Sequence, residues 1–87
     1  MIPTKRARQL VVDYFNSHVD PTDNVQITMD DTYVTWFNYT LGNWKALVST
    51  TIPDGKYYEV TYNADAKKTY VAVYIKFDQK TIDGWYL

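Results

Sequence analysis

Residues 33–63 read YVTWFNYTLGNWKALVSTTIPDGKYYEVTYN, three runs rich in β-branched and aromatic residues that two turn sequences separate. Residues of these types favour strands. The first turn, Gly42-Asn43, has two residues with glycine first, which is typical of a type II′ hairpin. The second turn, Pro53-Asp54-Gly55, suits a bulged hairpin. The sequence therefore predicts an antiparallel meander of three strands, at residues 33–41, 44–52 and 57–63.

The two turn lengths also predict which side chains share a face of the sheet. Phe37 is expected opposite Val48 and Val60, and Tyr39 opposite Ala46 and Tyr62. This apolar face, with Leu41 and Trp44, is expected to form the core. The opposite face is mostly polar but carries Val34, Trp36, Leu47 and Tyr57. Together with Trp85 these aromatic side chains are candidates for an exposed protein-binding patch; the alternative is that the tail, residues 85–87, folds over this face and both become core.

Helical periodicity flanks the meander on its N-terminal side. Residues 4–19 carry apolar side chains at the spacing of one helix stripe, with Thr4 as the expected cap. After Asn63 the pattern supports two interpretations, because residues 66–78 fit both a helix and an alternating strand. We predict a C-terminal helix there, although the density of β-branched residues favours a strand. The predicted fold is a single α+β domain over residues 1–87, ordered α-β-β-β-α.

Composition excludes several classes of function. The formal net charge is −1, far from the basic balance of proteins that bind nucleic acid through phosphate contacts. The chain has no cysteine, which excludes disulfides and thiolate chemistry and fits a reducing cytoplasm. The basic N-terminus is not followed by an uninterrupted apolar run, so neither a signal peptide nor a membrane span is predicted.

No residue pattern predicts catalysis, a cofactor or a metal. His18 is the only histidine and has no second ligand or acid–base partner in the sequence, so a role at the helix end is expected. The hydroxyl groups of residues 49–51 have no activating histidine nearby in the sequence, and the three glycines form no phosphate-binding loop. The acidic residues of the first connection do not match a calcium loop. We expect a protein that is not an enzyme.

A helix, three strands and a helix are also the order of double-stranded RNA-binding domains, which use basic residues at the start of the second helix. Lys67 and Lys68 occupy that position. A nucleic-acid-binding accessory protein is therefore the alternative hypothesis. Its candidate residues are Lys5, Arg6, Arg8, Lys67 and Lys68.

The segments NWKALVSTTIPDG at 43–55 and YYEVTYN at 57–63, with the leading helix and Asp30-Asp31, resemble a family of small uncharacterised proteins from phages and prophages of lactic-acid bacteria and streptococci. The resemblance implies a small accessory protein that acts in the cytoplasm of the bacterial host by binding a host or phage protein. One such role is inhibition of a defence system such as a CRISPR nuclease. Asp20, Asp23, Asp30 and Asp31 would then mimic nucleic-acid phosphates. A structural, homodimeric phage protein is the third alternative.

Overall fold

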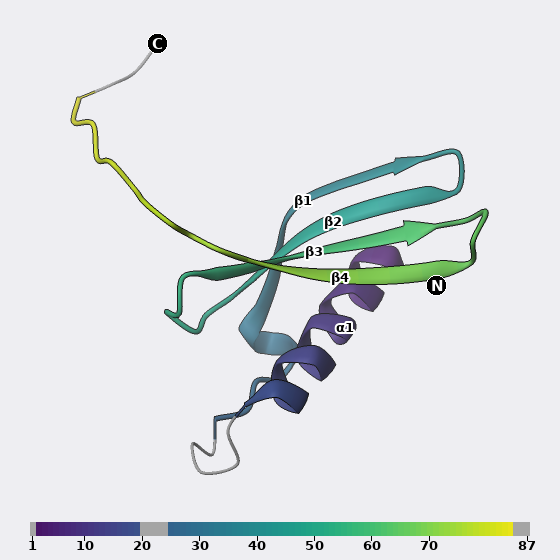
Figure 1. The fold of residues 1–87 in the computed structure, drawn as a ribbon, viewed down its shortest axis with the longest axis horizontal. Coiled ribbons are helices and arrows are strands. Elements are labelled where there is room, and N and C mark those ends of the chain that lie inside the picture. The colour runs from purple at the N-terminus through teal and green to yellow at the C-terminus, as the bar shows by residue number, and fades with distance from the viewer. Residues whose placement is uncertain (1, 20–24, 85–87) are drawn as a thin grey trace.

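The computed structural model describes residues 2–19 and 25–84, which form one helix packed on one antiparallel sheet (Figure 1). Helix α1 spans Pro3–His18, and a short 3-10 helix, η1, spans Met29–Asp31. The four strands are β1, Thr32–Thr40; β2, Asn43–Thr50; β3, Lys56–Asn63; and β4, Lys68–Ile75. They lie in the order β1-β2-β3-β4, and each neighbouring pair is antiparallel.

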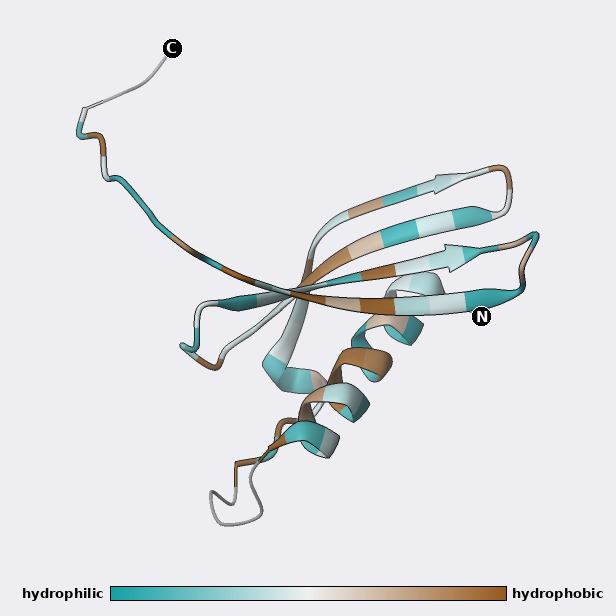
Figure 2. Cartoon of the chain, in the orientation of Figure 1, coloured by the Kyte–Doolittle hydropathy of each residue, from teal (hydrophilic) through white to brown (hydrophobic). Residues whose placement is uncertain are grey.

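The core lies between α1 and one face of the sheet. Ala7 and Val11 of the helix are fully buried, as are Ala46, Val48 and Val60 of the strands. Trp44 and Tyr58 complete the cluster, with Tyr14 packing its ring edge-on against Tyr58. Figure 2 shows the corresponding hydrophobic segments in the central turns of α1 and in the inner strands. The predicted helix is confirmed, except that it begins earlier: Pro3 is its first residue, and Ile2, not Thr4, is the N-cap. The predicted core face is confirmed for its central residues, but Tyr39 and Leu41 are wrong as core residues, because they lie at the end of β1 and in the turn after it and are 59 % and 92 % exposed.

The predicted C-terminal helix is wrong, because residues 68–75 form a fourth strand. Val71 and Val73 pair with Val60 and Tyr58 on the core face, so the alternation of side chains prevails over the helical spacing. The physical reason is the β-branched content of this segment, which restricts side-chain rotamers in a helix but fits a pleated sheet. The α+β class is confirmed, with four strands in place of three strands and a helix.

The first hairpin turn lies one residue earlier in the chain than predicted. Thr40 pairs with Asn43, so the turn residues are Leu41 and Gly42, with φ angles of 52° and 83°. Two left-handed residues make a type I′ turn, whose twist matches that of the strands. The pairing of β1 with β2 consequently moves by two residues, and Phe37 lies opposite Ala46 instead of Val48. The predicted pairing of β2 with β3 is wrong by two residues as well, since Val60 lies opposite Ala46 instead of Val48. Because side chains alternate with a period of two, this slip leaves every side chain from Phe37 to Tyr39 on its predicted face.

A β-bulge corrects the prediction for Val34. The register changes between Val34 and Trp36, so that Thr35 is the extra residue on β1. Val34 therefore pairs with Val48 and packs against the core, whereas the simple alternation placed it on the outer face. Trp36 stays on the outer face, opposite Leu47.

Candidate functional site: the outer face of the sheet

The face of the sheet that points away from α1 carries a group of aromatic and apolar side chains. The strand pairing aligns Tyr33, Ser49, Tyr57 and Tyr74 in one row across the four strands, and Trp36, Leu47, Glu59 and Ala72 in the next. Tyr70 follows, opposite Thr61. We define the outer aromatic face as Tyr33, Trp36, Leu47, Tyr57, Tyr70 and Tyr74.

These aromatic side chains are accessible to solvent. Trp36 is 47 % exposed, whereas Trp44, on the core face of the neighbouring strand, is 7 % exposed. The helix contacts β1, β2 and β3 from the core side, and the extended residues after β4 run away from the sheet (Figure 1). Among residues 2–19 and 25–84, therefore, no helix or strand covers the outer aromatic face. The alternative that residues 85–87 cover it, and the candidate Trp85 itself, lie outside the described residues.

The local geometry gives this face a rigid part and a polar part. The rings of Tyr57 and Tyr74 stack with centroids 5.2 Å apart and an interplanar angle of 13°. Lys45 and Glu59 form an ion pair of 3.3 Å between the neighbouring strands. Beside it, Trp36, Asn38, Thr40 and Thr61 help to line a shallow hollow of about 360 Å³. Exposed aromatic rings next to polar groups are typical of surfaces that bind other macromolecules.

A second concave region lies at the C-terminal end of α1 and contains titratable groups. His18, Asp54, Lys56 and Tyr58 help to line a cleft of about 380 Å³. His18 stacks on Tyr14 with ring centroids 4.0 Å apart, and its Nδ1 lies 2.8 Å from the Tyr14 carbonyl oxygen. Burial raises the pKa of the Tyr58 phenol above its ordinary 10.0, and the charges of Asp54 and Tyr14 act in the same direction.

The chemistry of this cleft is that of a packed helix end. The imidazole of His18 is held against its own helix, as the sequence predicted. The raised pKa makes the Tyr58 phenol a weaker acid than an ordinary phenol, so it keeps its proton at neutral pH. Within the described residues, no three histidine, cysteine, aspartate or glutamate side chains lie close enough together to hold a metal ion.

Residues 4–84 match a protein family that is described as a family of unknown function, DUF6275. The chain belongs to this family. No curated protein and no solved structure matches the chain. The DUF6275 match begins in α1 and continues beyond β4, so the helix, all four strands and the outer aromatic face belong to the family domain. In residues 2–19 and 25–84 of this DUF6275 domain, no helix is long and apolar enough to cross a membrane.

The acidic candidates of the DUF6275 domain do not form one site in the described residues. Asp31 is engaged locally: its carboxylate accepts hydrogen bonds from the Thr28 backbone N–H at 2.8 Å and from the Thr51 hydroxyl at 3.3 Å. It thereby closes the capping box of η1. Asp30 is exposed beside it. Asp20 and Asp23 lie outside the described residues.

The basic candidates lie in two separate places, on α1 and around the β3–β4 turn, and one of them is engaged in a structural contact. Arg8 donates from Nε to the Thr32 hydroxyl at 2.9 Å and from Nη2 to the Met29 carbonyl at 2.6 Å, and so ties α1 to the start of β1. Lys67 lies in the β3–β4 turn with a φ of 53°, and Lys68 begins β4. The second helix that the RNA-binding comparison requires is absent from the described residues, because β4 takes its place.

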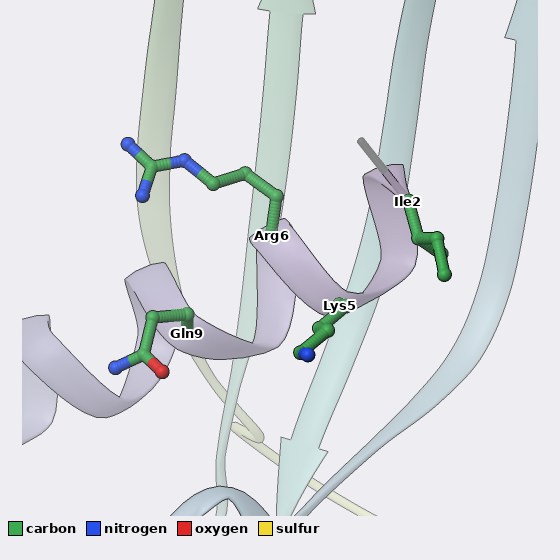
Figure 3. Close-up of a pocket in the computed structure, with 4 residues that line it drawn as sticks. All are labelled: Ile2, Lys5, Arg6 and Gln9. Atoms are coloured by element: carbon green, nitrogen blue, oxygen red, sulfur yellow. The ribbon is translucent and has the colours of Figure 1, made fainter.

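The remaining two basic candidates lie on the first turns of α1. Figure 3 shows Lys5 and Arg6 with Ile2 and Gln9, the residues that line a surface depression. The four side chains leave the helix in different directions, and the Arg6 guanidinium extends away from the Lys5 ammonium. This arrangement does not converge on one ligand.

Sequence reasoning missed three members of the outer aromatic face: Tyr33, Tyr70 and Tyr74. Tyr70 and Tyr74 were hidden by the expected helix, although Tyr70, Ala72 and Tyr74 alternate with Val71, Val73 and Ile75. That alternation was the signal that could have found them. The predicted outer positions of Trp36, Leu47 and Tyr57 agree with the strand pairing.

Proposed function

We propose that this DUF6275 domain is a non-enzymatic protein-binding module and that the outer aromatic face is its binding surface. The observation that carries the proposal is the exposure of Trp36, Tyr57 and Tyr74 on one side of a sheet whose other side is buried by α1. Tryptophan and tyrosine are enriched among the residues that contribute most to binding energy at protein interfaces.

The stacking of Tyr57 on Tyr74 favours binding without a large ordering cost. Each ring restricts the other, and both stand on paired strands, so a partner meets a surface whose side chains are already arranged. Binding loses about 0.5–1.5 kcal/mol for each flexible side chain that it immobilises, and preorganised rings avoid part of this loss.

A protein partner fits this face better than a nucleic acid does. Single strands of nucleic acid also stack on exposed aromatic rings of antiparallel sheets, but they need cations along the same face to neutralise phosphates. Here Lys45 is paired with Glu59, and the whole chain carries a net charge of −1. An aromatic surface whose Lys45–Glu59 ion pair carries no net charge, with polar groups around it, is typical of a protein interface.

The biological role that we propose follows from the resemblance to phage proteins. In this proposal the domain is a phage accessory protein of the host cytoplasm that binds and blocks a host protein, such as a component of a CRISPR defence system. The outer aromatic face supplies the anchor. Asp30, with Asp20 and Asp23, supplies the charge that mimics phosphates, whereas Asp31 has its carboxylate engaged in the fold.

The test is an affinity pull-down from the lysate of a lactic-acid bacterium, with nuclease treatment, read by mass spectrometry. We compare the tagged wild type with the double variant Trp36→Ala/Tyr57→Ala. Tyr39→Ala is the matched control, because Tyr39 is an exposed aromatic residue of the same strand on the other face. The proposal predicts a protein that the wild type and Tyr39→Ala retain and the double variant loses. Equal recovery by the double variant contradicts it, and loss on nuclease treatment indicates nucleic acid instead.

A further inference from the structure

The chain continues past β4 as an arm, which we define as residues 76–84. The Lys76 backbone N–H donates to the Gly55 carbonyl at 2.8 Å, and no residue from 77 to 84 makes a main-chain hydrogen bond to another described segment. Phe77 is 100 % exposed and Ile82 is 68 % exposed. Figure 1 shows the arm running away from the sheet, and Figure 2 shows that hydrophobic residues continue into it. An extended segment with a fully exposed phenylalanine lacks the burial that would fix it in a monomer.

The opposite edge of the same sheet is an unprotected strand. Strand β1, TYVTWFNYT, has nine residues, none of which is charged and none of which is proline. It pairs with β2 on one side, and the described residues provide no strand for its other side. Edge strands usually carry charges or proline that prevent pairing with another chain, and β1 has only the bulge at Thr35. This edge is therefore open to β-augmentation by an extended segment.

We propose that two copies of this chain exchange arms, so that the arm of each copy adds a strand to the β1 edge of the other. The arm and β1 are similar in length, since β1 has nine residues and the arm spans 76–84. The absence of charge on β1 means that Lys76, Asp78 and Lys80 of the arm meet no like charge there. The reciprocal exchange closes with two-fold symmetry and leaves no further edge of this type to propagate.

The alternation of side chains indicates what the exchange buries. Phe77 continues the series Val71, Val73 and Ile75 at every second residue, which is the side of the sheet that faces α1. On the second copy this side of the β1 edge carries Val34 and Phe37, both only partly buried against the core. In the arm exchange that we propose, Phe77 faces this same side of the partner's sheet and lies beside the apolar border of the partner's core. The outer aromatic face takes no part, so this inference and the proposed function fail independently.

The test is sedimentation equilibrium of the full chain from about 1 to 100 μM, with hydrogen exchange of the β1 amides. The variants are Phe77→Asp and the control Leu41→Asp. Leu41 is 92 % exposed and lies in the left-handed region, where aspartate is tolerated, so both substitutions add a charge without disturbing the core. We expect a wild-type dimer and a dissociation constant at least about 100-fold higher for Phe77→Asp, because each dimer loses two buried phenylalanines. Leu41→Asp is expected to dimerise like the wild type.

Hydrogen exchange identifies the strand that receives the arm. Arm exchange predicts that β1 amides are protected in the wild-type dimer and exchange faster in Phe77→Asp, while β2 and β3 amides are unchanged. A monomeric wild type over this concentration range overturns the proposal. So does a dimer that Phe77→Asp leaves intact, which places the contact elsewhere, for example on the outer aromatic face. Lost dimerisation with unchanged β1 exchange excludes β1 as the acceptor and also overturns it.

Discussion

Replacing each of the two described tryptophans by alanine compares the two faces of the sheet directly. Trp36 and Trp44 lie on neighbouring strands, and their exposures are 47 % and 7 %. The difference of 40 points corresponds to about 100 Å² of a side chain that offers up to about 250 Å², and so to about 2.5 kcal/mol at about 25 cal/mol per Å². We expect Trp44→Ala to lower the free energy of unfolding by about 3–5 kcal/mol. The loss for Trp36→Ala is expected to be smaller than the Trp44→Ala loss by roughly 2–3 kcal/mol.

The assay is urea unfolding followed by far-ultraviolet circular dichroism, which does not depend on the tryptophans as reporters. Total stability of a domain of this size is about 4–13 kcal/mol, so the Trp44→Ala loss is a large fraction of it. The same substitution is made in both variants and both residues are in strands, which cancels most of the difference in strand propensity. Equal losses of stability for the two variants would contradict this prediction, because they would mean that the outer aromatic face is as buried as the core.

Three further predictions concern single residues. Asp31→Asn is expected to lower stability by about 1 kcal/mol through the capping box, whereas Asp30→Asn stays within about 0.5 kcal/mol; equal effects in urea unfolding would contradict the capping role. Leu41→Asn is expected to raise stability by about 0.5–1 kcal/mol, because asparagine before Gly42 suits the type I′ turn; a lower melting temperature would argue against a left-handed Leu41. The raised pKa of Tyr58 means that its stabilising contribution is present below pH 10 and is lost as the pH rises through the folded-state pKa. Tyr58→Phe should therefore lose less stability than the wild type between pH 9 and 11, and parallel pH curves would contradict this.

The helix, three strands and the two faces of the sheet could be predicted from the sequence because each depends on a local period of apolar residues, 3.6 in the helix and two in the strands. The two-residue slip in the first hairpin escaped it, since Gly42 fits either the first position of a type II′ turn or the second of a type I′ turn, and the choice requires Leu41 to accept a positive φ. A shift of two residues leaves each side chain on its predicted face, because side chains alternate between the faces with a period of two. The bulge at Thr35 has no sequence signal of its own, and it places the residues before it, Val34 and Tyr33 among them, on the face opposite to the one that simple alternation predicts.

The wrong prediction for β4 had the largest effect on the predicted site, because it removed Tyr70 and Tyr74 from the outer aromatic face. Residues 70–77 satisfy both periods, and the outcome depends on whether β3 offers a free edge, which is a tertiary property. With β4 assigned as a helix, Tyr74 had no reason to lie beside Tyr57, and the stacked pair could not be foreseen. The role of Asp31 could not be predicted either, because one of its hydrogen-bond partners, Thr28, lies before it in the sequence and the other, Thr51, lies after β2.

Whether the outer aromatic face is the binding surface is tested by the affinity of the captured partner for the wild type, Trp36→Ala and Tyr39→Ala, measured by titration calorimetry at matched ionic strength. Trp36 is the tryptophan of the outer aromatic face, and Tyr39 lies on the opposite side of the same strand. We expect Trp36→Ala to weaken binding at least about 30-fold, as is typical of an aromatic anchor, while Tyr39→Ala changes the affinity less than about threefold. An unchanged affinity for Trp36→Ala would contradict the assignment of this face as the binding surface.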